Sequence, residues 1–144
     1  MGGSAGDVWH ASSVAVSGRG LLILGASGSG KSSLALQMMA LGALLVADDR
    51  TVLTLRDGAV WLSSPPTIRG RIEARGIGIL NAQSAPDTVL HAVIDLGQVE
   101  NNRLPPERSI TLLGCSFPLL HGSASPNFPA GVMQFLRAGR AEGP

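Results

Sequence analysis

Short apolar runs separated by turns dominate the hydrophobic pattern of the first fifty residues. Residues 21–24 are all apolar and the run stops at Gly25, which predicts a short buried strand. Residues 8–16 alternate loosely between apolar and polar positions and predict a strand just before it. Residues 43–47 predict a further buried strand. The pattern therefore predicts a sheet whose first strands surround a glycine-rich turn.

A helix is predicted over residues 31–41, between the second and third of these strands. Its apolar side chains recur at helical spacing, so we expect one face of the helix to pack on the sheet. The residues concerned are Leu34, Met38 and Leu41, and Gly42 follows at the usual position of a helix-ending glycine. This order of strand, glycine turn, helix and strand indicates an α/β fold.

The second half of the chain predicts a hairpin and a short helix. Residues 51–56 and 59–64 are strand-like runs joined by Asp57-Gly58, a pair that favours tight hairpin turns. Residues 129–137 predict a helix that begins at a proline, with an apolar face formed by Val132, Met133 and Leu136.

Composition is typical of a single globular domain. The 144 residues are 44% hydrophobic, which suffices for a core. Basic and acidic residues nearly balance, at 11 and 10, so a nucleic-acid partner has little electrostatic support. The single cysteine, Cys115, cannot form an internal disulfide, which fits a reducing cytoplasm. No targeting segment or membrane-length apolar stretch is visible, and residues 1–7 and 139–144 are expected to fray.

The turn after the first apolar run carries the most specific motif. Residues 25–32 have the spacing G-x-x-x-x-G-K-[ST] of a phosphate-binding loop. Glycines let the backbone wrap its amides around an anion, while Lys31 can reach the β- and γ-phosphates of a nucleotide and the Ser32 hydroxyl can ligate Mg²⁺. The predicted nucleotide-binding residues are Gly25, Ala26, Ser27, Gly28, Ser29, Gly30, Lys31, Ser32 and Ser33.

Two adjacent carboxylates, Asp48 and Asp49, follow the strand predicted at residues 43–47. Near a phosphate-binding loop, such carboxylates can bind Mg²⁺ directly or through water, or accept a proton from an attacking hydroxyl. Aspartates at the end of a strand also form turns, so a structural role is the alternative. His10, near the start of the strand predicted at residues 8–16, would lie within reach of the same site.

Residues 72–81 predict a glycine-punctuated strand or loop. If this segment is extended, alternation places Glu73 and Arg75 on one face, where a carboxylate could hold metal and a guanidinium could hold phosphate. A solvated ion pair on a strand face is the alternative.

Four features, in chain order, resemble the bacterial HPr kinase/phosphorylase family. They are His10, the loop at residues 25–32, the run at residues 45–49, and the segment at residues 72–81, which is similar to that family's signature. The resemblance covers residues 8–103 well. It implies a mixed sheet around the loop, like that of phosphoenolpyruvate carboxykinase. It also implies a Mg-ATP-dependent kinase, typically a hexamer, that phosphorylates a serine of HPr, the small phosphocarrier of the sugar phosphotransferase system.

The resemblance implies roles for individual residues. Lys31 would hold the phosphates, and Ser32 with Glu73 would bind Mg²⁺. One or both of Asp48 and Asp49 would take the serine proton. The other site residues would be His10, Arg103 as a catalytic arginine, and the signature residues Glu73, Arg75, Gly76, Gly78 and Asn81. The C-terminal helix would either grip HPr or simply pack on the core.

The sequence also departs from the family pattern. Ala26 and Ser33 stand where aspartate and glutamate are usual, and residues 121–128 replace the segment associated with removing the phosphate. The chain resembles the short form of some α-proteobacteria, which is expected to serve regulation and for which phosphorylase activity is in doubt.

Two functions are therefore carried forward. The first is a serine kinase acting on an HPr-like phosphocarrier. The second is a nucleotide-binding regulatory module with little turnover that signals through a partner such as a sensor kinase. The presence of Lys31, Asp48, Asp49 and Glu73 together favours the kinase, because binding alone does not require a base.

Overall fold

The structure is a computed structural model that describes residues 6–141. A mixed β-sheet forms the body of the protein. The strands follow the order β1-β5-β6-β9-β3-β2-β4, with β11 paired to the later part of β9 and β10 paired to β11. Their bounds are β1 (Asp7–Trp9), β2 (Ala11–Val16), β3 (Arg19–Leu24), β4 (Leu44–Ala47), β5 (Thr51–Arg56), β6 (Ala59–Ser63), β9 (Thr88–Val99), β10 (Ser109–Leu112) and β11 (Cys115–Gly122). A separate hairpin is formed by β7 (Arg71–Ala74) and β8 (Gly78–Asn81), and the helices are α1 (Lys31–Ala40), the 3₁₀ turn η1 (Pro66–Ile68) and α2 (Phe128–Ala138).

Strand β9 is the centre of the sheet. It runs parallel to β3, with Leu24 opposite Asp95, and parallel to β11, with Leu119 opposite Val93. The carboxyl ends of three parallel strands therefore meet at one edge. The predicted strand at residues 21–24 is confirmed as part of β3, and it is apolar at every position because both of its faces are covered.

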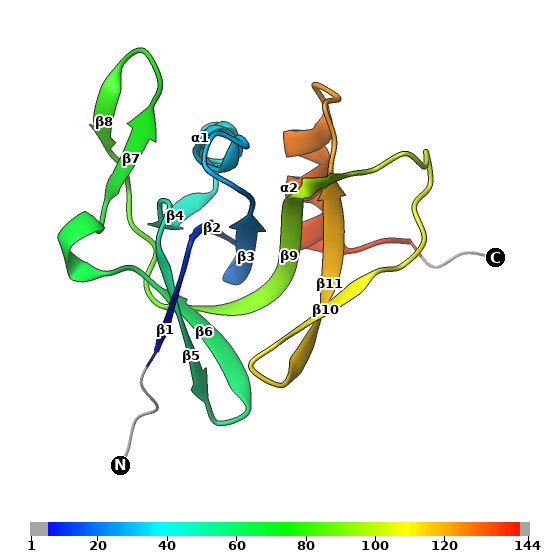
Figure 1. Cartoon of the computed structure of the whole chain (residues 1–144), viewed down its shortest axis with the longest axis horizontal. Coiled ribbons are helices and arrows are strands. Elements are labelled where there is room, and N and C mark those ends of the chain that lie inside the picture. Colours follow the sequence, from blue (N-terminus) through cyan, green and yellow to red (C-terminus); the bar gives the residue numbers. More distant parts are fainter. Residues whose placement is uncertain (1–5, 142–144) are drawn as a thin grey trace.

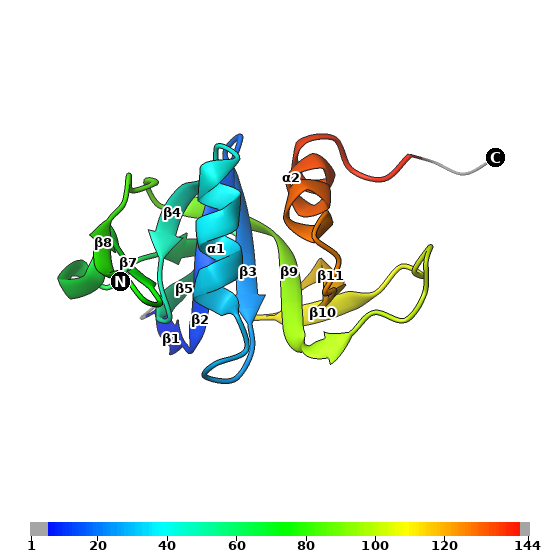
Figure 2. The ribbon, with the colours of Figure 1, turned by 90° about the horizontal axis from the view of Figure 1, so that it is seen from above.

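Two apolar cores lie on the two faces of this curled sheet. Leu21 and Ile23 of β3 point into one core, which is completed by α1 and α2. Leu22 points into the other core, which is closed by side chains of β5, β6 and the β10–β11 hairpin. Figure 2 shows α1 and α2 side by side on one face of the sheet, where they contact each other.

The two predicted helices are confirmed with one correction. In α1, Leu34 and Met38 are buried as expected, but Leu41 is 45% exposed. The prediction for Leu41 was wrong because the helix ends at Ala40 and the chain leaves it through Gly42, whose φ is 111°. In α2, the predicted apolar face is buried against the core: Val132, Met133 and Leu136.

The hairpin predicted at residues 51–64 is also confirmed. Positive φ angles at Asp57 (51°) and Gly58 (78°) join β5 to β6, as a tight two-residue turn requires. Strand β6 then pairs antiparallel with the start of β9.

Two other segments were predicted incorrectly. Residues 8–16 are not one strand, because the chain bends at His10; β1 pairs with β5, whereas β2 pairs with β3 and β4. Residues 72–81 are not one extended segment but lie in the β7–β8 hairpin. A turn closed by Ile77 N donating to Ala74 O (3.0 Å) reverses the chain, and Gly76 supplies its positive φ of 87°.

Of the predicted frayed ends, residues 1–5 and 142–144 lie outside the described residues, whereas Asp7 belongs to β1. Between residues 6 and 141, the structure contains no helix long and apolar enough to cross a membrane.

Candidate functional site

The glycine loop, Gly25–Gly30, connects the carboxyl end of β3 to the start of α1. Gly25 has a φ of 158° and packs so closely on Ser29 that a Cβ would collide with that side chain. Gly30 is the N-cap of α1, with a left-handed φ of 102° and no side chain to cap the helix. The first turn of α1 also lacks an acidic residue, so its free amides can receive an anion.

Lys31 points back into this loop. Its side chain is only 5% exposed, and Nζ donates to the carbonyl oxygens of Gly25 (2.8 Å) and Ala26 (3.1 Å). The hydroxyl of Ser29 is buried in the same loop and has no hydrogen-bond partner among the described residues. Because charge-assisted bonds to phosphate are stronger than bonds to neutral carbonyls, the ammonium can exchange these partners for an incoming anion.

Asp48 is held by donors from three elements. Its Oδ1 accepts from Ser32 Oγ at 2.6 Å and from Ser12 Oγ at 3.1 Å, and its Oδ2 accepts from the backbone N of Glu73 at 3.0 Å. This carboxylate therefore joins α1, β2 and β7. With both oxygens already occupied, it is better suited to positioning than to collecting a proton from a substrate.

Asp49 faces the opposite way, toward the lysine. Its Oδ1 lies 2.7 Å from His10 Nε2 and 3.9 Å from Lys31 Nζ, and its side chain is 54% exposed. The structure thus brings His10, Lys31 and Asp49 together, as the sequence predicted. The Asp49 carboxylate remains open to an approaching molecule.

The backbone of Asp49 fixes this orientation. Its φ is 66°, a left-handed value that is uncommon outside glycine, and Arg50 N donates to Asp48 O (2.8 Å) across it. Ser12 Oγ accepts from the backbone N of Asp49 at 3.0 Å. Strained backbone of this kind concentrates at functional sites.

Ser12 is the residue that sequence reasoning missed. It is fully buried in β2 and contacts both aspartates, donating to Asp48 and accepting from Asp49. The available indication was the adjacent polar pair Ser12 and Ser13, which interrupts the loose apolar–polar alternation of the strand predicted at residues 8–16. Buried polar groups require hydrogen-bond partners, so such a pair marks a place where side chains of other elements converge.

A cleft of about 640 Å³ opens beside the glycine loop. One wall is the loop and the start of α1, and the other is the β7–β8 hairpin, which stands beside α1 in Figure 1. The predicted site residues that line the cleft are Ser27, Gly28, Gly30, Lys31, Ser32, Ser33, Asp49, Glu73 and Arg75. Leu36, Ala74 and Ile77 complete it.

Four other predicted residues do not line the cleft. Gly76 and Gly78 form the hairpin turn with φ values of 87° and 136°, and Asn81 pairs with Arg71 at the hairpin base. Arg103 is not part of the cleft, and it is exposed in the connection between β9 and β10. Strand β9 continues to Val99 before the chain reaches Arg103, whose catalytic role stays a prediction.

The oxygen atoms near the loop fit a magnesium ion that is bound together with a nucleotide. Within residues 6–141 there is no group of three or more His, Cys, Asp or Glu side chains arranged to hold a metal. Ser32 and Asp48 are in contact, and Ser32 and Glu73 line the same cleft. Mg²⁺ is commonly bound by one or two carboxylates together with substrate phosphates, so this oxygen set fits an ion that arrives with a nucleotide.

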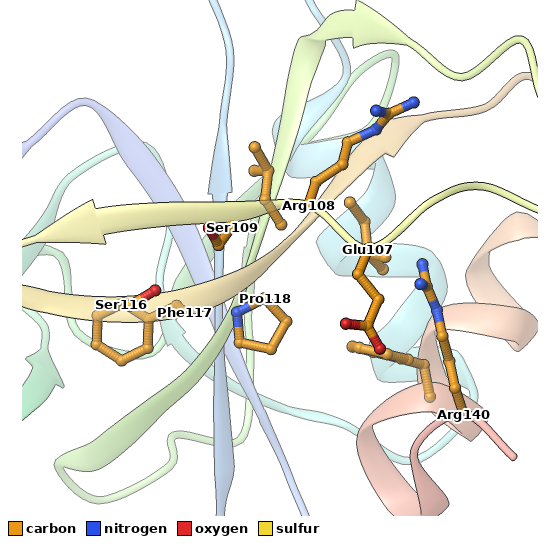
Figure 3. A pocket seen from close by; sticks show the side chains of 10 residues that line it. Glu107, Arg108, Ser109, Ser116, Phe117, Pro118 and Arg140 are labelled. Atoms are coloured by element: carbon orange, nitrogen blue, oxygen red, sulfur yellow. The ribbon is translucent and has the colours of Figure 1, made fainter. Parts of the chain in front are cut away.

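A second cavity, of about 620 Å³, lies between the β10–β11 hairpin and α2 (Figure 3). Phe117, Leu119 and Phe135 supply apolar surface, and Glu107 and Arg140 supply charge. No predicted catalytic or nucleotide-binding residue lines this cavity. We therefore place the candidate site at the cleft beside the glycine loop.

A parallel strand, a glycine loop and a helix with an uncapped N-terminus and a buried lysine are typical of α/β proteins that bind phosphate. Residues 4–96 match the family described as the HPr Serine kinase C-terminal domain, and the chain belongs to this family.

Similar proteins support this assignment. The chain is 44% identical over 72 residues to the HPr kinase/phosphorylase of Clostridium botulinum, covering 50% of this chain and 24% of the relative. It is 31% identical over 101 residues to the HPr kinase/phosphorylase of Mycoplasmopsis pulmonis, covering 65% of this chain and 33% of the relative. The chain thus spans about a quarter to a third of the curated relatives it matches. A solved structure, the Hpr(Ser) kinase/phosphatase from Coxiella burnetii, superposes with a TM-score of 0.77 at 25% identity, covering 91% of this chain and 88% of that chain.

Proposed function

We propose that this chain is a Mg-ATP-dependent serine kinase domain that acts on an HPr-like phosphocarrier protein. The observation that carries the proposal is that the two adjacent aspartates have different surroundings. Asp48 is saturated by hydrogen bonds and contacts Ser32, whereas Asp49 is open to the cleft beside Lys31 and His10. A site that only binds a nucleotide has no need for the second carboxylate.

Nucleotide binding is assigned to the glycine loop and its lysine. The amides at the start of α1 and the Lys31 ammonium would hold the phosphates of ATP, as in a phosphate-binding loop. Ser32 and Glu73 would hold Mg²⁺, which neutralises charge on the β- and γ-phosphates when it is bound. Asp48 accepts hydrogen bonds from the Ser32 hydroxyl and from the backbone N of Glu73, and so fixes the positions of both residues for metal binding.

Asp49 is assigned as the general base. The serine oxygen of the acceptor forms a bond to the γ-phosphorus, the bond from phosphorus to the β,γ-bridging oxygen breaks, and ADP leaves. Asp49 accepts the hydroxyl proton. His10 Nε2 lies 2.7 Å from Asp49 Oδ1 and would hold that carboxylate toward the cleft. Arg75, which lines the hairpin wall, supplies positive charge next to the transferred group.

The wider setting of the proposal follows the family. We propose that the sheet around the loop is of the phosphoenolpyruvate carboxykinase-like type and that the protein works in the cytoplasm as a homo-oligomer. Residues 121–128 lack the family segment associated with phosphate removal, so the domain would act mainly as a kinase.

The test is phosphate transfer from γ-labelled ATP to a purified HPr protein. Wild-type protein should label HPr on serine, and the label should require Mg²⁺. Lys31→Ala should abolish labelling and weaken ATP binding, because it removes the only buried cation of the loop. Its circular dichroism should stay native, because both hydrogen bonds of the lysine side chain go to carbonyls of the loop itself.

Near-normal labelling by Lys31→Ala would contradict the proposal. Tight ATP binding by wild-type protein without any labelling of HPr would instead support the regulatory module.

A further inference from the structure

The β7–β8 hairpin exposes large apolar side chains beside the cleft. Ile77 is 76% exposed at the turn, and Ile79 is 65% exposed on β8, opposite Glu73. The other face of the hairpin carries Ile72, which is buried in the core against the helices. Packing in the core therefore accounts for the isoleucine on the inner face of the hairpin but not for those on its outer face. Exposed apolar residues that cluster commonly mark interaction sites.

The same part of the molecule carries arginines that lack partners. Within the described residues, five arginines contact backbone carbonyls, carboxylates or aromatic rings: Arg19, Arg56, Arg108, Arg137 and Arg140. In contrast, the side chains of Arg50, Arg69, Arg71 and Arg75, like that of Arg103 in the connection between β9 and β10, make no hydrogen bond, ion pair or ring contact in that part of the chain. All four are exposed, and Glu73 is the single acidic residue between positions 69 and 81.

The hairpin is anchored at its base and free at its tip. Glu73 N donates to Asp48 Oδ2, and Ala82 N donates to Gly70 O at 2.9 Å. Figure 1 shows the tip projecting beyond the sheet next to α1. An element of this shape offers a preorganised surface in direct continuity with the cleft wall.

We propose that the outer face of the β7–β8 hairpin, together with Arg50, is the docking surface for the acceptor protein. This inference rests on the proposed kinase function and specifies its substrate. The acceptor would be a folded protein that presents its serine beside an apolar side chain and surface carboxylates. The apolar contact would be made by Ile77 and Ile79, and the carboxylates would face the unpaired arginines.

Position and size argue for a protein at this surface. The acceptor hydroxyl must reach a phosphate held near Lys31 and Asp49, so the body of the acceptor must rest on the walls of the cleft. Ile77 lines the cleft but Ile79 and Arg71 do not, so the surface extends past the room that a nucleotide fills. Electrostatic complementarity at such a rim mainly raises the rate of encounter.

The test compares two hairpin variants with a matched control. Arg71→Glu reverses a charge, and Ile79→Ser removes an exposed apolar side chain; neither residue lines the cleft. Leu104→Ser is the control, because Leu104 is 76% exposed in the connection between β9 and β10. For each protein we would measure ATP affinity, HPr affinity with a non-hydrolysable ATP analogue, and kcat and KM for HPr.

We expect each hairpin variant to weaken HPr affinity and raise the KM for HPr by about fivefold or more, with kcat and ATP affinity unchanged. Added salt should shrink the effect of Arg71→Glu. Leu104→Ser should match the wild type in every measurement.

The affinity measurement separates this inference from the proposed function. If the wild type binds HPr but transfers no phosphate, the kinase proposal fails while the docking surface is still judged by the variants. Wild-type affinity in both hairpin variants would overturn the docking surface, as would an absence of HPr binding by the wild type. A change in oligomeric mass caused by the hairpin variants would also overturn it, since the surface would then join copies of this chain.

Discussion

Asp48 and Asp49 are chemically identical neighbours that the fold places in different surroundings. Asp48 receives three donors, whereas Asp49 turns outward through a left-handed backbone to meet His10. The difference arises from Ser12, which donates to one carboxylate and accepts from the backbone of the other. In the proposed function, Asp48 would position the metal-binding hydroxyl of Ser32 and Asp49 would accept the proton.

The backbone of Asp49 supplies a prediction about stability. At a φ of 66°, a side chain with a Cβ is strained relative to glycine. We therefore expect Asp49→Gly to be more stable than Asp49→Ala by about 1 kcal/mol, the reverse of the usual order. Both variants lack the carboxylate, so the comparison isolates the backbone.

Urea unfolding of the two variants measures this difference. The same comparison at Ser32, inside α1, serves as a control and should favour alanine. If Asp49→Ala is as stable as Asp49→Gly, the turn at Asp49 is not strained.

At the scale of elements, the sequence predicted correctly those strands, helices and turns that depend on residues close together in the chain. The strand at residues 21–24, the glycine loop and α1 follow each other directly, and the Asp57-Gly58 turn identifies its hairpin. The β7–β8 hairpin was missed because its turn depends on Gly76, and glycines at 76 and 78 are equally compatible with a loop. The break at His10 was missed because it reflects pairing of β1 with β5, whose residues lie 42 to 46 positions further along the chain.

A pair beyond the site, Glu100 and Arg108, ties the end of β9 to the start of β10. Hydrogen bonds from Arg108 to the carboxylate, at 2.9 and 3.3 Å, hold the pKa of Glu100 below its ordinary value of 4.5. A lowered pKa in the folded state means that the charged carboxylate stabilises the fold. This contribution is complete above pH 4.5 and is lost as the pH falls through the lowered pKa.

We therefore expect Glu100→Gln to reduce the free energy of unfolding at neutral pH, and the difference from wild type to vanish in acid. Urea unfolding across pH checks this. Asp87→Asn is the control, because it breaks the more exposed pair with Arg56 and should cost less at neutral pH. A pH-independent effect of Glu100→Gln would contradict the assignment.

At the scale of the whole molecule, the order of the strands in the sheet could not be predicted from the hydrophobic pattern of the sequence. Strand β9 lies between β3 and β6 and also binds β11, so its neighbours come from distant parts of the chain. Periodicity identifies strands but not their partners. The placement of Arg103 outside the cleft has the same cause, because it depends on how far β9 runs past the glycine loop.

The same long-range pairing creates the candidate site. Strand β2 pairs with β3 and β4, which brings Ser12 and both aspartates next to the glycine loop. The β7–β8 hairpin then closes the cleft through the bond from Glu73 N to Asp48. The sequence supplied the chemical groups, and the non-local sheet pairing determined which of them meet.

The measurement that tests this account most directly is single-turnover transfer from Mg-ATP to HPr by Asp49→Asn, with Asp48→Asn as the matched control. Asp49→Asn should bind ATP like the wild type and transfer phosphate about 10²–10⁴-fold more slowly, because a general base is lost. Asp48→Asn should instead weaken Mg-dependent ATP binding, because its contact with Ser32 is altered. Transfer by Asp49→Asn at nearly the wild-type rate would contradict the assignment of Asp49 as the base.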